Sequence, residues 1–366
     1  YPALDAPLPR FKPTKLEQEF QSDNQDSVHD AWFLPSLEIS YETDSVTFTS
    51  STSYFSRNAY LVEEGTEQTN SLLGIIESAS GLPAGAIPRY DANTSFKYDQ
   101  DSHNRAFNQE IRASFTASDW LSGVVGARYG KSTFKRTLIG SPLFGLSETG
   151  LWPDDTYWIG YEDTQASDKS IYGEAYLRYG DFELSLGLRQ YWLTQQTNRV
   201  QTEGLLSGGL VLQPRSKNSA QGLNPKVALS YKLPNDGLVY ASASKGFRQG
   251  LINFPLSQLC VDHLPDIGLT EESARASDPD TVWNYELGAK VRVGKLNVTA
   301  AAFQMDWKGI QQTVIVPVCG YSLITNAGAA RSRGAELEIA GELFRGFSVR
   351  MGIGYNDAKI IDAGAS

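Results

Sequence analysis

Residues 182–189 read FELSLGLR, and the order of these side chains decides what kind of fold the chain can adopt. Apolar residues occupy every even-numbered position, whereas Glu183, Ser185, Gly187 and Arg189 occupy the odd-numbered ones. Successive side chains of a strand point to opposite faces of the sheet. This segment therefore predicts a strand with one wholly apolar face and one face that carries ionised groups.

The same alternation recurs along the chain and gives about twelve candidate strands, whereas no segment is convincing as an amphipathic helix. Further examples are YELGAKVRV at 285–293, the segment 108–115 and FSVRMGIGY at 347–355. The candidates near 182–198 and 296–313 exceed the roughly 9–11 residues that a tilted strand needs to cross a bilayer. The sequence thus predicts an all-β fold of long antiparallel strands.

The connections between these strands alternate between short and long. The short turns lie at 42–45, 118–119, 180–181, 233–237, 294–295 and 341–346, and the long polar segments lie at about 59–103, 138–168, 199–218, 249–280 and 314–323. Outer-membrane barrels have short periplasmic turns and long extracellular loops. The pattern favours an antiparallel transmembrane β-barrel. The alternative is a soluble protein of two β-sandwich domains, each with one buried face, although long structureless loops are rare in compact domains.

The composition agrees with a barrel. The 366 residues include 41% hydrophobic residues, 33 glycines, 18 tyrosines and 16 phenylalanines, which suits a β-rich protein with aromatic belts. No run approaches the roughly 18 consecutive apolar residues of a transmembrane helix, whereas barrel strands need apolar residues only at alternate positions. The net charge of −10 and the lack of a basic stripe argue against nucleic acid as a partner.

The alternation assigns individual side chains to the two faces of the barrel wall. The side chains expected to face lipid are Leu184, Leu186, Leu287, Val291, Val349 and Ile353. Those expected to face the lumen are Glu183, Arg189, Glu286, Lys290 and Arg292. A shift of the register by one residue would exchange the two sets.

Four segments in order resemble the β-barrel of TonB-dependent outer-membrane transporters. They are YASASKGFRQGLINF at 240–254, the paired strands at 278–312, TNAGAARSRGAELEIAGEL at 325–343 and GFSVRMGIGYNDAKI at 346–360. The resemblance covers 219–360 most clearly and extends more weakly over 28–218. It implies a barrel of 22 strands with an N-terminal plug domain inside.

The chain differs from the family's pattern at its start, YPALDAPLPRF, which resembles neither a plug nor an energy-coupling box. Either a signal was removed or the chain begins in mid-protein. We therefore expect one partial barrel domain, residues 1–366, without the plug. Residues 1–27 would form a loop segment and 28–360 would form about twelve of the 22 strands.

The resemblance also implies a function, a location and partners. It implies a receptor in the outer membrane of a Gram-negative bacterium, in contact with outer-membrane lipid, that takes up a scarce ligand. A ferric siderophore is the family's commonest cargo, and cobalamin, haem or an oligosaccharide remain open. A TonB-type energy-transducing protein would act through the plug. The alternatives are a passive diffusion porin or structural barrel and, third, a soluble β-sandwich binding module.

The sequence offers no sign of catalysis, of a metal site or of a cofactor. The three histidines, His29, His103 and His263, are scattered, and no nucleophile elbow or Walker A motif is present. The charged residues expected on the inner face form ladders across neighbouring strands, which satisfy one another on a wet wall. We therefore expect a transport protein rather than an enzyme.

Ligand contacts are expected in the long loops. The segment LWPDDTYWIGYED at 151–163 places four aromatic residues beside carboxylates, which suits stacking on a ligand and hydrogen bonding to it. The same aromatic residues could instead hold the loop together. Arg248, at the rim, and Tyr321, in the loop 314–323, complete the candidates. The predicted ligand contacts are Trp152, Tyr157, Trp158, Tyr161, Arg248 and Tyr321.

Cys260 and Cys319 are the two cysteines of the chain, and they lie in successive long loops on the same side of the predicted barrel. An exported barrel folds through an oxidising compartment, where exposed cysteines pair. We predict a disulfide between them that closes a ring of about 60 residues, worth roughly 4 kcal/mol in chain entropy. The alternative is two buried thiols that pack as small apolar residues.

Overall fold

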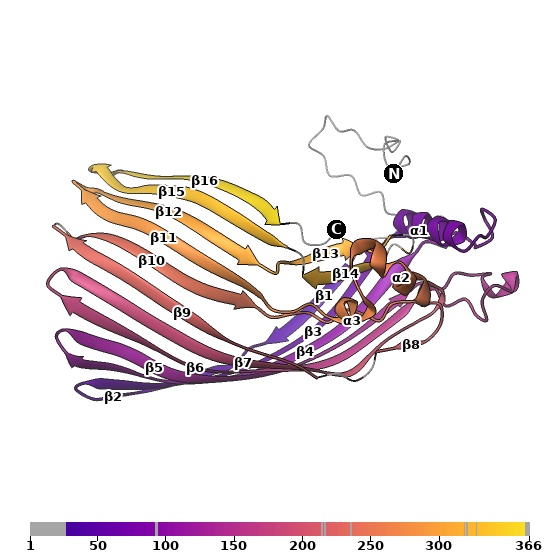
Figure 1. Ribbon diagram of the computed structural model, residues 1–366, viewed down its shortest axis with the longest axis horizontal. Coiled ribbons are helices and arrows are strands. Elements are labelled where there is room, and N and C mark those ends of the chain that lie inside the picture. The colour runs from indigo at the N-terminus through magenta and orange to yellow at the C-terminus, as the bar shows by residue number, and fades with distance from the viewer. Residues whose placement is uncertain are drawn as a thin grey trace.

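The computed structural model describes residues 27–91, 94–213, 215, 217–234, 236–317, 319, 321–326 and 328–362. Its main feature is one strongly curved antiparallel sheet, open along one side, with the helices gathered beyond one end of the strands (Figure 1). The order along the sheet is β1-β3-β4-β5-β6-β7-β9-β10-β11-β12-β15-β16, with β2 paired to β3 and β8 paired to β7. The prediction of an antiparallel all-β barrel wall is confirmed.

The wall strands are arranged in sequence order, and all of them except β2 and β8 pair with their neighbours in that order. They are β1 (Ser27–Phe33), β2 (Ser36–Glu42), β3 (Val46–Glu64), β4 (Lys97–Ser118), β5 (Leu121–Gly140), β6 (Ile159–Tyr179), β7 (Phe182–Glu203), β8 (Val211–Leu212), β9 (Lys217–Leu233), β10 (Gly237–Arg248), β11 (Asp280–Val293), β12 (Leu296–Lys308), β15 (Ala329–Phe344) and β16 (Phe347–Asp362). Because β1 and β2 pair with successive parts of β3, they share one position in the wall. The predicted loop segment 1–27 lies outside the described residues except for Ser27, which begins β1.

The pairing register separates the two faces as the sequence predicts. Leu184 lies opposite Leu229, which lies opposite Ala241, and Ala241 lies opposite Leu287, so one apolar row crosses four strands. The row continues through Ala302 and Ala335 to Tyr355. Leu186 on this face is 45% exposed, as expected of a side chain whose neighbours are lipid rather than protein.

The opposite face is polar and lies on the hollow side of the sheet. A hollow of about 720 Å³ lies against it near the short turns, and its lining includes Arg112, Tyr176, Arg178 and Glu183. Across this face, Glu174 accepts hydrogen bonds from Lys226 at 2.8 Å and from Ser185 at 2.5 Å. Cross-strand ladders of this kind satisfy the charges of a wall whose inner face is wet.

The connection lengths alternate between the two rims, as predicted. The short turns lie at 43–45, 119–120, 180–181, 234–236, 294–295 and 345–346, and the long connections lie at 65–96, 141–158, 204–216, 249–279 and 309–328. Gly180 and Gly294 have φ of 57° and 61°, the left-handed conformation that a two-residue hairpin requires and that glycine adopts without steric cost.

The prediction that the chain has no convincing helix is wrong. The long connections contain α1 (Thr66–Ala79), α2 (Gln258–Asp262) and α3 (Glu271–Arg275), the short 3₁₀ helices η1 (Ser147–Thr149), η2 (Leu205–Ser207) and η3 (Leu264–Ile267), and a hairpin of β13 (Gln311–Ile315) and β14 (Ser322–Asn326). None of the helices in the described part of the chain is long and apolar enough to span a membrane.

The five long connections pack together into what we call the loop layer, which has two apolar cores. The first core centres on the buried side chains of α1 and on Phe96, Tyr157 and Trp158. The second contains Cys260, Leu264, Val316 and Leu323. The wall strands add few side chains to either core, because their inner face is polar. The loop layer is therefore a folded unit above the wall.

A buried ion pair fixes the first core. The carboxylate of Glu77 accepts two hydrogen bonds from the Arg89 guanidinium and further ones from the backbone N–H groups of Ile87 at 2.7 Å and Gly85 at 3.2 Å. The hydrogen bonds from Arg89 hold the pKa of Glu77 at about 2. Glu77 thus ties the end of α1 to the segment that follows it.

Candidate functional site

A pocket of about 560 Å³ lies where the loop layer meets the inner face of the wall. Its lining brings together Tyr98 of β4, Arg136 of β5, Trp158 before β6, Phe254 of the connection 249–279 and Tyr321 of the connection 309–328. These residues come from five segments that are far apart in sequence. Aromatic walls with a few polar groups are the usual features of a small-molecule site.

Arg136 is the charged group of this pocket. It lies opposite Glu162 in the register of β5 and β6, and its Nη2 donates to the Glu162 carboxylate at 2.9 Å. Its guanidinium also lies over the Phe254 ring, 4.8 Å from the centroid. The Arg136 Nε is buried and has no acceptor among the described residues. An arginine with a free N–H in a buried setting is suited to an anionic oxygen of a ligand.

Trp158 offers a second free donor. It is 5% exposed, and its ring makes edge contacts with Tyr98 and Phe254, with centroid distances of 6.0 and 5.7 Å. Its indole Nε1 has no acceptor among the described residues. A buried donor without a partner costs free energy. A ligand that supplied acceptors to Trp158 and Arg136 would remove this cost at both groups.

Two tyrosines complete the lining with hydroxyls that stay neutral. Tyr157 is fully buried in the first core, where its ring packs against Tyr90 and Phe96, and this burial raises the pKa of Tyr157 well above its ordinary value. Burial likewise raises the pKa of Tyr321. Both phenols therefore keep their protons at neutral pH and present polar hydroxyls without charge.

The structure brings three of the six predicted ligand contacts, Tyr157, Trp158 and Tyr321, into one pocket and leaves the others apart. Trp152 lines a separate hollow of about 300 Å³. Tyr161 lies on β6 beneath the guanidinium of Arg199, 4.8 Å from the ring centroid. A ligand role for each of the six stays a prediction.

Sequence reasoning missed Tyr98, Arg136 and Phe254. Arg136 lies on a predicted strand, whereas Tyr98 lies in the predicted long segment 59–103. In the structure Tyr98 belongs to β4 and Arg136 to β5, and both share the polar, inward face. The inward parity of Arg136 was a usable signal, because an arginine near the loop end of the inner face is placed to meet a ligand. Phe254 has no such signal, since the fold of the loop alone brings it beside Arg136.

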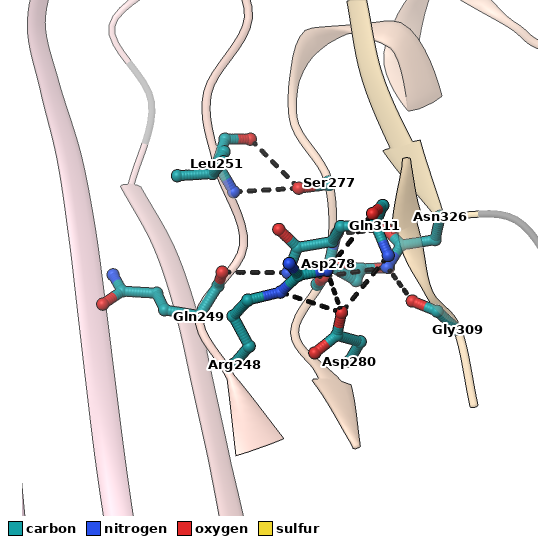
Figure 2. Close-up of polar contacts among 9 residues, drawn as sticks. All are labelled: Arg248, Gln249, Leu251, Ser277, Asp278, Asp280, Gly309, Gln311 and Asn326. Carbon is teal, nitrogen blue, oxygen red and sulfur yellow. Dashed lines mark hydrogen bonds and ion pairs between the residues drawn. The ribbon is translucent and has the colours of Figure 1, made fainter. Parts of the chain in front are cut away.

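Arg248 lies outside the pocket, at the base of two loops. Its Nε and Nη2 donate to Asp280 at 3.1 and 2.6 Å, and Nη2 also reaches the Gln311 carbonyl at 3.2 Å (Figure 2). The Asp280 side chain is 2% exposed. The guanidinium also lies over the Trp307 ring, 5.2 Å from its centroid. These contacts join the end of β10, the start of β11 and the segment after β12.

Two amides extend these contacts. The Gln311 side chain donates to the carbonyls of Gln249 and Asp278 at 2.9 and 3.2 Å, and the Asn326 side chain donates to those of Asp278 and Gly309 at 2.9 and 2.7 Å (Figure 2). We call the group Arg248, Asp280, Gln311 and Asn326 the root clamp. It fixes the bases of the connections 249–279 and 309–328 to each other.

The tips of the same two connections are joined by a disulfide between Cys260 and Cys319, whose Cα atoms lie 5.4 Å apart. Both cysteines are buried in the second core. Between the bridge and the root clamp, Asn253 donates to the carbonyls of Ala274 at 2.9 Å and Ile324 at 2.7 Å. The two connections therefore form one panel of the loop layer.

Residues 5–365 match the family model of the TonB-dependent receptor-like β-barrel. The chain belongs to the TonB-dependent receptors. The metal-pseudopaline receptor CntO of Pseudomonas aeruginosa, in strains PAO1 and UCBPP-PA14, is 26% identical over 157 residues, which is 42% of this chain and 19% of that protein.

Solved TonB-dependent receptors share the fold at low identity. The ferric yersiniabactin uptake receptor FyuA from Yersinia pestis has a TM-score of 0.67 and 16% identity, over 92% of this chain and 44% of that one. The copper transporter OprC has a TM-score of 0.63 and 12% identity, over 93% of this chain and 49% of that one. This receptor chain thus spans less than half the length of each.

Membership of the family places this receptor in the outer membrane of a Gram-negative bacterium. The exposed apolar face of the wall is then the face that meets lipid, and the polar hollow face is the inner one. TonB-dependent receptors are transporters rather than enzymes.

Proposed function

We propose that this chain is part of a receptor for the energy-coupled uptake of a small, anionic metal–chelator complex, most specifically a ferric siderophore. The observation that carries the proposal is the pocket under the loop layer, in which Arg136 Nε and Trp158 Nε1 are both buried without acceptors. The deprotonated oxygens of a siderophore that surround its metal ion would supply those acceptors, and the aromatic walls would contact its organic scaffold.

Relatives support this ligand class. The partly matching protein CntO is named as a metal-pseudopaline receptor, and FyuA as a ferric yersiniabactin uptake receptor. A TonB-type energy-transducing protein, acting through a plug domain, would be the partner. The chain would then supply about half of a larger barrel, which agrees with its covering 44–49% of FyuA and OprC. A passive porin is less consistent with a loop layer that folds around two apolar cores.

Uptake by the complete receptor tests the proposal. The receptor is expressed from its full gene in a Gram-negative host that lacks its own siderophore receptors. Radioactive iron is offered as hydroxamate, catecholate, carboxylate and amino-carboxylate chelates. We expect saturable uptake of one class, abolished in a host that lacks the energy-transducing protein. Uptake that persists in that host, without saturation, would establish the porin instead.

Two variants test the pocket itself. Arg136→Gln removes the charged donor and should raise the half-saturating concentration roughly 10- to 100-fold, since a hydrogen bond to a charged group contributes about 1.5–3 kcal/mol. Trp158→Phe removes the N–H and keeps an aromatic ring, so its effect should be smaller. Trp152→Phe, in the separate hollow, serves as the matched control. Equal uptake by Arg136→Gln, Trp158→Phe and the control Trp152→Phe would show that the ligand binds outside this pocket.

A further inference from the structure

The outward faces of β4, β5 and β6 carry a line of three exposed cations. Going from the short turns toward the loop layer, the apolar band of the outward face ends at Phe107 on β4, Tyr129 on β5 and Ile171 on β6. The next outward position on each strand holds a cation. These cations are Arg105, Lys131 and Lys169, and all three are exposed. Large apolar or aromatic outward side chains resume only ten residues beyond the end of the band, at Ile139 of β5 and Tyr161 of β6.

The register places these cations close together. Lys131 lies opposite Phe107, two residues from Arg105, and Lys169 lies opposite Tyr129, two residues from Lys131. With strands about 4.8 Å apart and a rise of about 3.3 Å per residue, neighbouring Cα atoms in the line lie roughly 8 Å apart. Because barrel strands tilt by about 35–45°, a step of one strand and two residues keeps the line roughly level with the membrane surface.

No carboxylate neutralises the line. On β3 to β9, the three outward rows that contain Arg105, Lys131 and Lys169 hold no acidic residue among the described positions. The first acidic residue above them, Asp163, lies 3.4 Å from a different cation, Lys135. Three neighbouring cations without counter-charges stand out on a chain whose net charge is −10.

The other half of the wall is different. On β15 and β16, two outward cations above the apolar band are paired with carboxylates of the protein. Arg331 lies 2.5 Å from Asp306, and Lys359 lies 2.7 Å from Asp357. The line on β4, β5 and β6 has no such counter-charge among the described residues, so its cations are free to bind an anion from outside the protein.

We propose that Arg105, Lys131 and Lys169 bind the phosphate groups of an anionic glycolipid in the outer leaflet of the membrane. Cations at the edge of an apolar band lie at the level of lipid headgroups, and arginine binds phosphate through two parallel hydrogen bonds. Directly below the line, Ile111, Ala127 and Ile171 form one outward row that would contact the acyl chains. This continuity of cations with an apolar surface favours a lipid over free phosphate.

The test measures lipid binding by the full-length receptor, purified in a phosphate-free detergent and titrated with lipopolysaccharide that carries phosphorylated lipid A. Native mass spectrometry counts the bound lipids. The variant Arg105→Gln, Lys131→Gln, Lys169→Gln should bind roughly 100-fold more weakly, from about 5-fold per cation. The charge-retaining variant Arg105→Lys, Lys131→Arg, Lys169→Arg should bind like the wild type, which separates the loss of charge from a failure to fold.

A second variant of equal charge serves as the control. Lys232→Gln, Lys295→Gln, Arg345→Gln removes three exposed cations at the short-turn rim, and it should leave binding unchanged. Equal loss in both glutamine variants would show a general effect of net charge and overturn the proposal. The proposal also fails if dephosphorylated lipid binds as well as the phosphorylated form, or if inorganic phosphate at millimolar concentration displaces the lipid. None of these outcomes depends on the transported ligand.

Discussion

Arginine in place of Leu186 should destabilise the barrel by roughly 2–4 kcal/mol, because Leu186 lies near the middle of the bilayer. On β7, the outward aromatic residues that mark the two edges of the apolar band are Phe182 and Trp192. Leu186 is four residues from the first and six from the second. With a rise of about 3.3 Å per residue and a tilt of about 40°, it lies roughly 10 Å from one edge and 15 Å from the other. The resulting band of about 25 Å agrees with that of outer-membrane barrels.

The assay is equilibrium unfolding of the full-length receptor by denaturant in phospholipid vesicles. Thr194→Arg is the matched control, because Thr194 faces outward on the same strand beyond Trp192, where arginine costs about 0–1 kcal/mol. Substitution of Ser185, on the inner face, gives a second comparison. Equal destabilisation by Leu186→Arg and Thr194→Arg would refute the assigned depth, and no effect at Leu186 would refute its contact with lipid.

Three further predictions concern the loop layer. Cys260 and Cys319 should resist a maleimide reagent until reduction, and reduction should speed proteolysis within 249–279; labelling of both without reduction would contradict the bridge. Glu77 has a pKa lowered to about 2 from 4.5, so its stabilisation is complete above about pH 4.5 and is lost as the pH falls toward 2. The protection factors of the α1 amides, corrected for the intrinsic exchange rate at each pH, should fall over that range, and Glu77→Gln, which costs roughly 1–3 kcal/mol, should remove this pH dependence. Arg248→Ala leaves the buried Asp280 carboxylate without its cation and should cost roughly 3–5 kcal/mol, whereas Asp280→Asn should cost less; exchange rates at the bases of both connections report the difference.

The wall could be predicted from the sequence because the same two-residue alternation of apolar and polar side chains recurs in every strand. Leu184 and Leu186 share a face for the same reason as Leu287 and Ile353, namely that strands alternate and one face meets lipid. The alternation of short and long connections then shows which end of each strand lies at which rim of the wall. These two patterns determine the strand order and the two faces of the wall without any knowledge of distant contacts, but they assign the loop-side ends of β3, β4, β6 and β7 to the long segments 59–103, 138–168 and 199–218.

The loop layer could not be predicted in the same way. Helix α1 has only a short apolar stripe, Leu72, Leu73 and Ile76, and its N-terminus lacks a side-chain cap. A search for helical periodicity in the sequence therefore finds only a polar segment. The stability of α1 comes from packing against Phe96, at the end of the same connection, and against Tyr157, which follows only after the two strands β4 and β5. For the same reason the pocket could be predicted only in part. Tyr157 and Trp158 stood out as loop aromatics, whereas Arg136 and Phe254, which line the pocket beside Trp158, meet it only through the strand register and the loop fold.

The root clamp and the bridge have a consequence for protein engineering. Because the second core is built from both 249–279 and 309–328, a graft of either connection alone onto another receptor would carry half of an apolar core and half of a hydrogen-bond network. Successful exchange of recognition surfaces between receptors should therefore require both connections to be moved together, with Arg248 and Asp280 at their base. The two connections therefore form one unit of exchange between receptors. Related chains would then differ in ligand preference through joint changes in both connections rather than through changes in one of them.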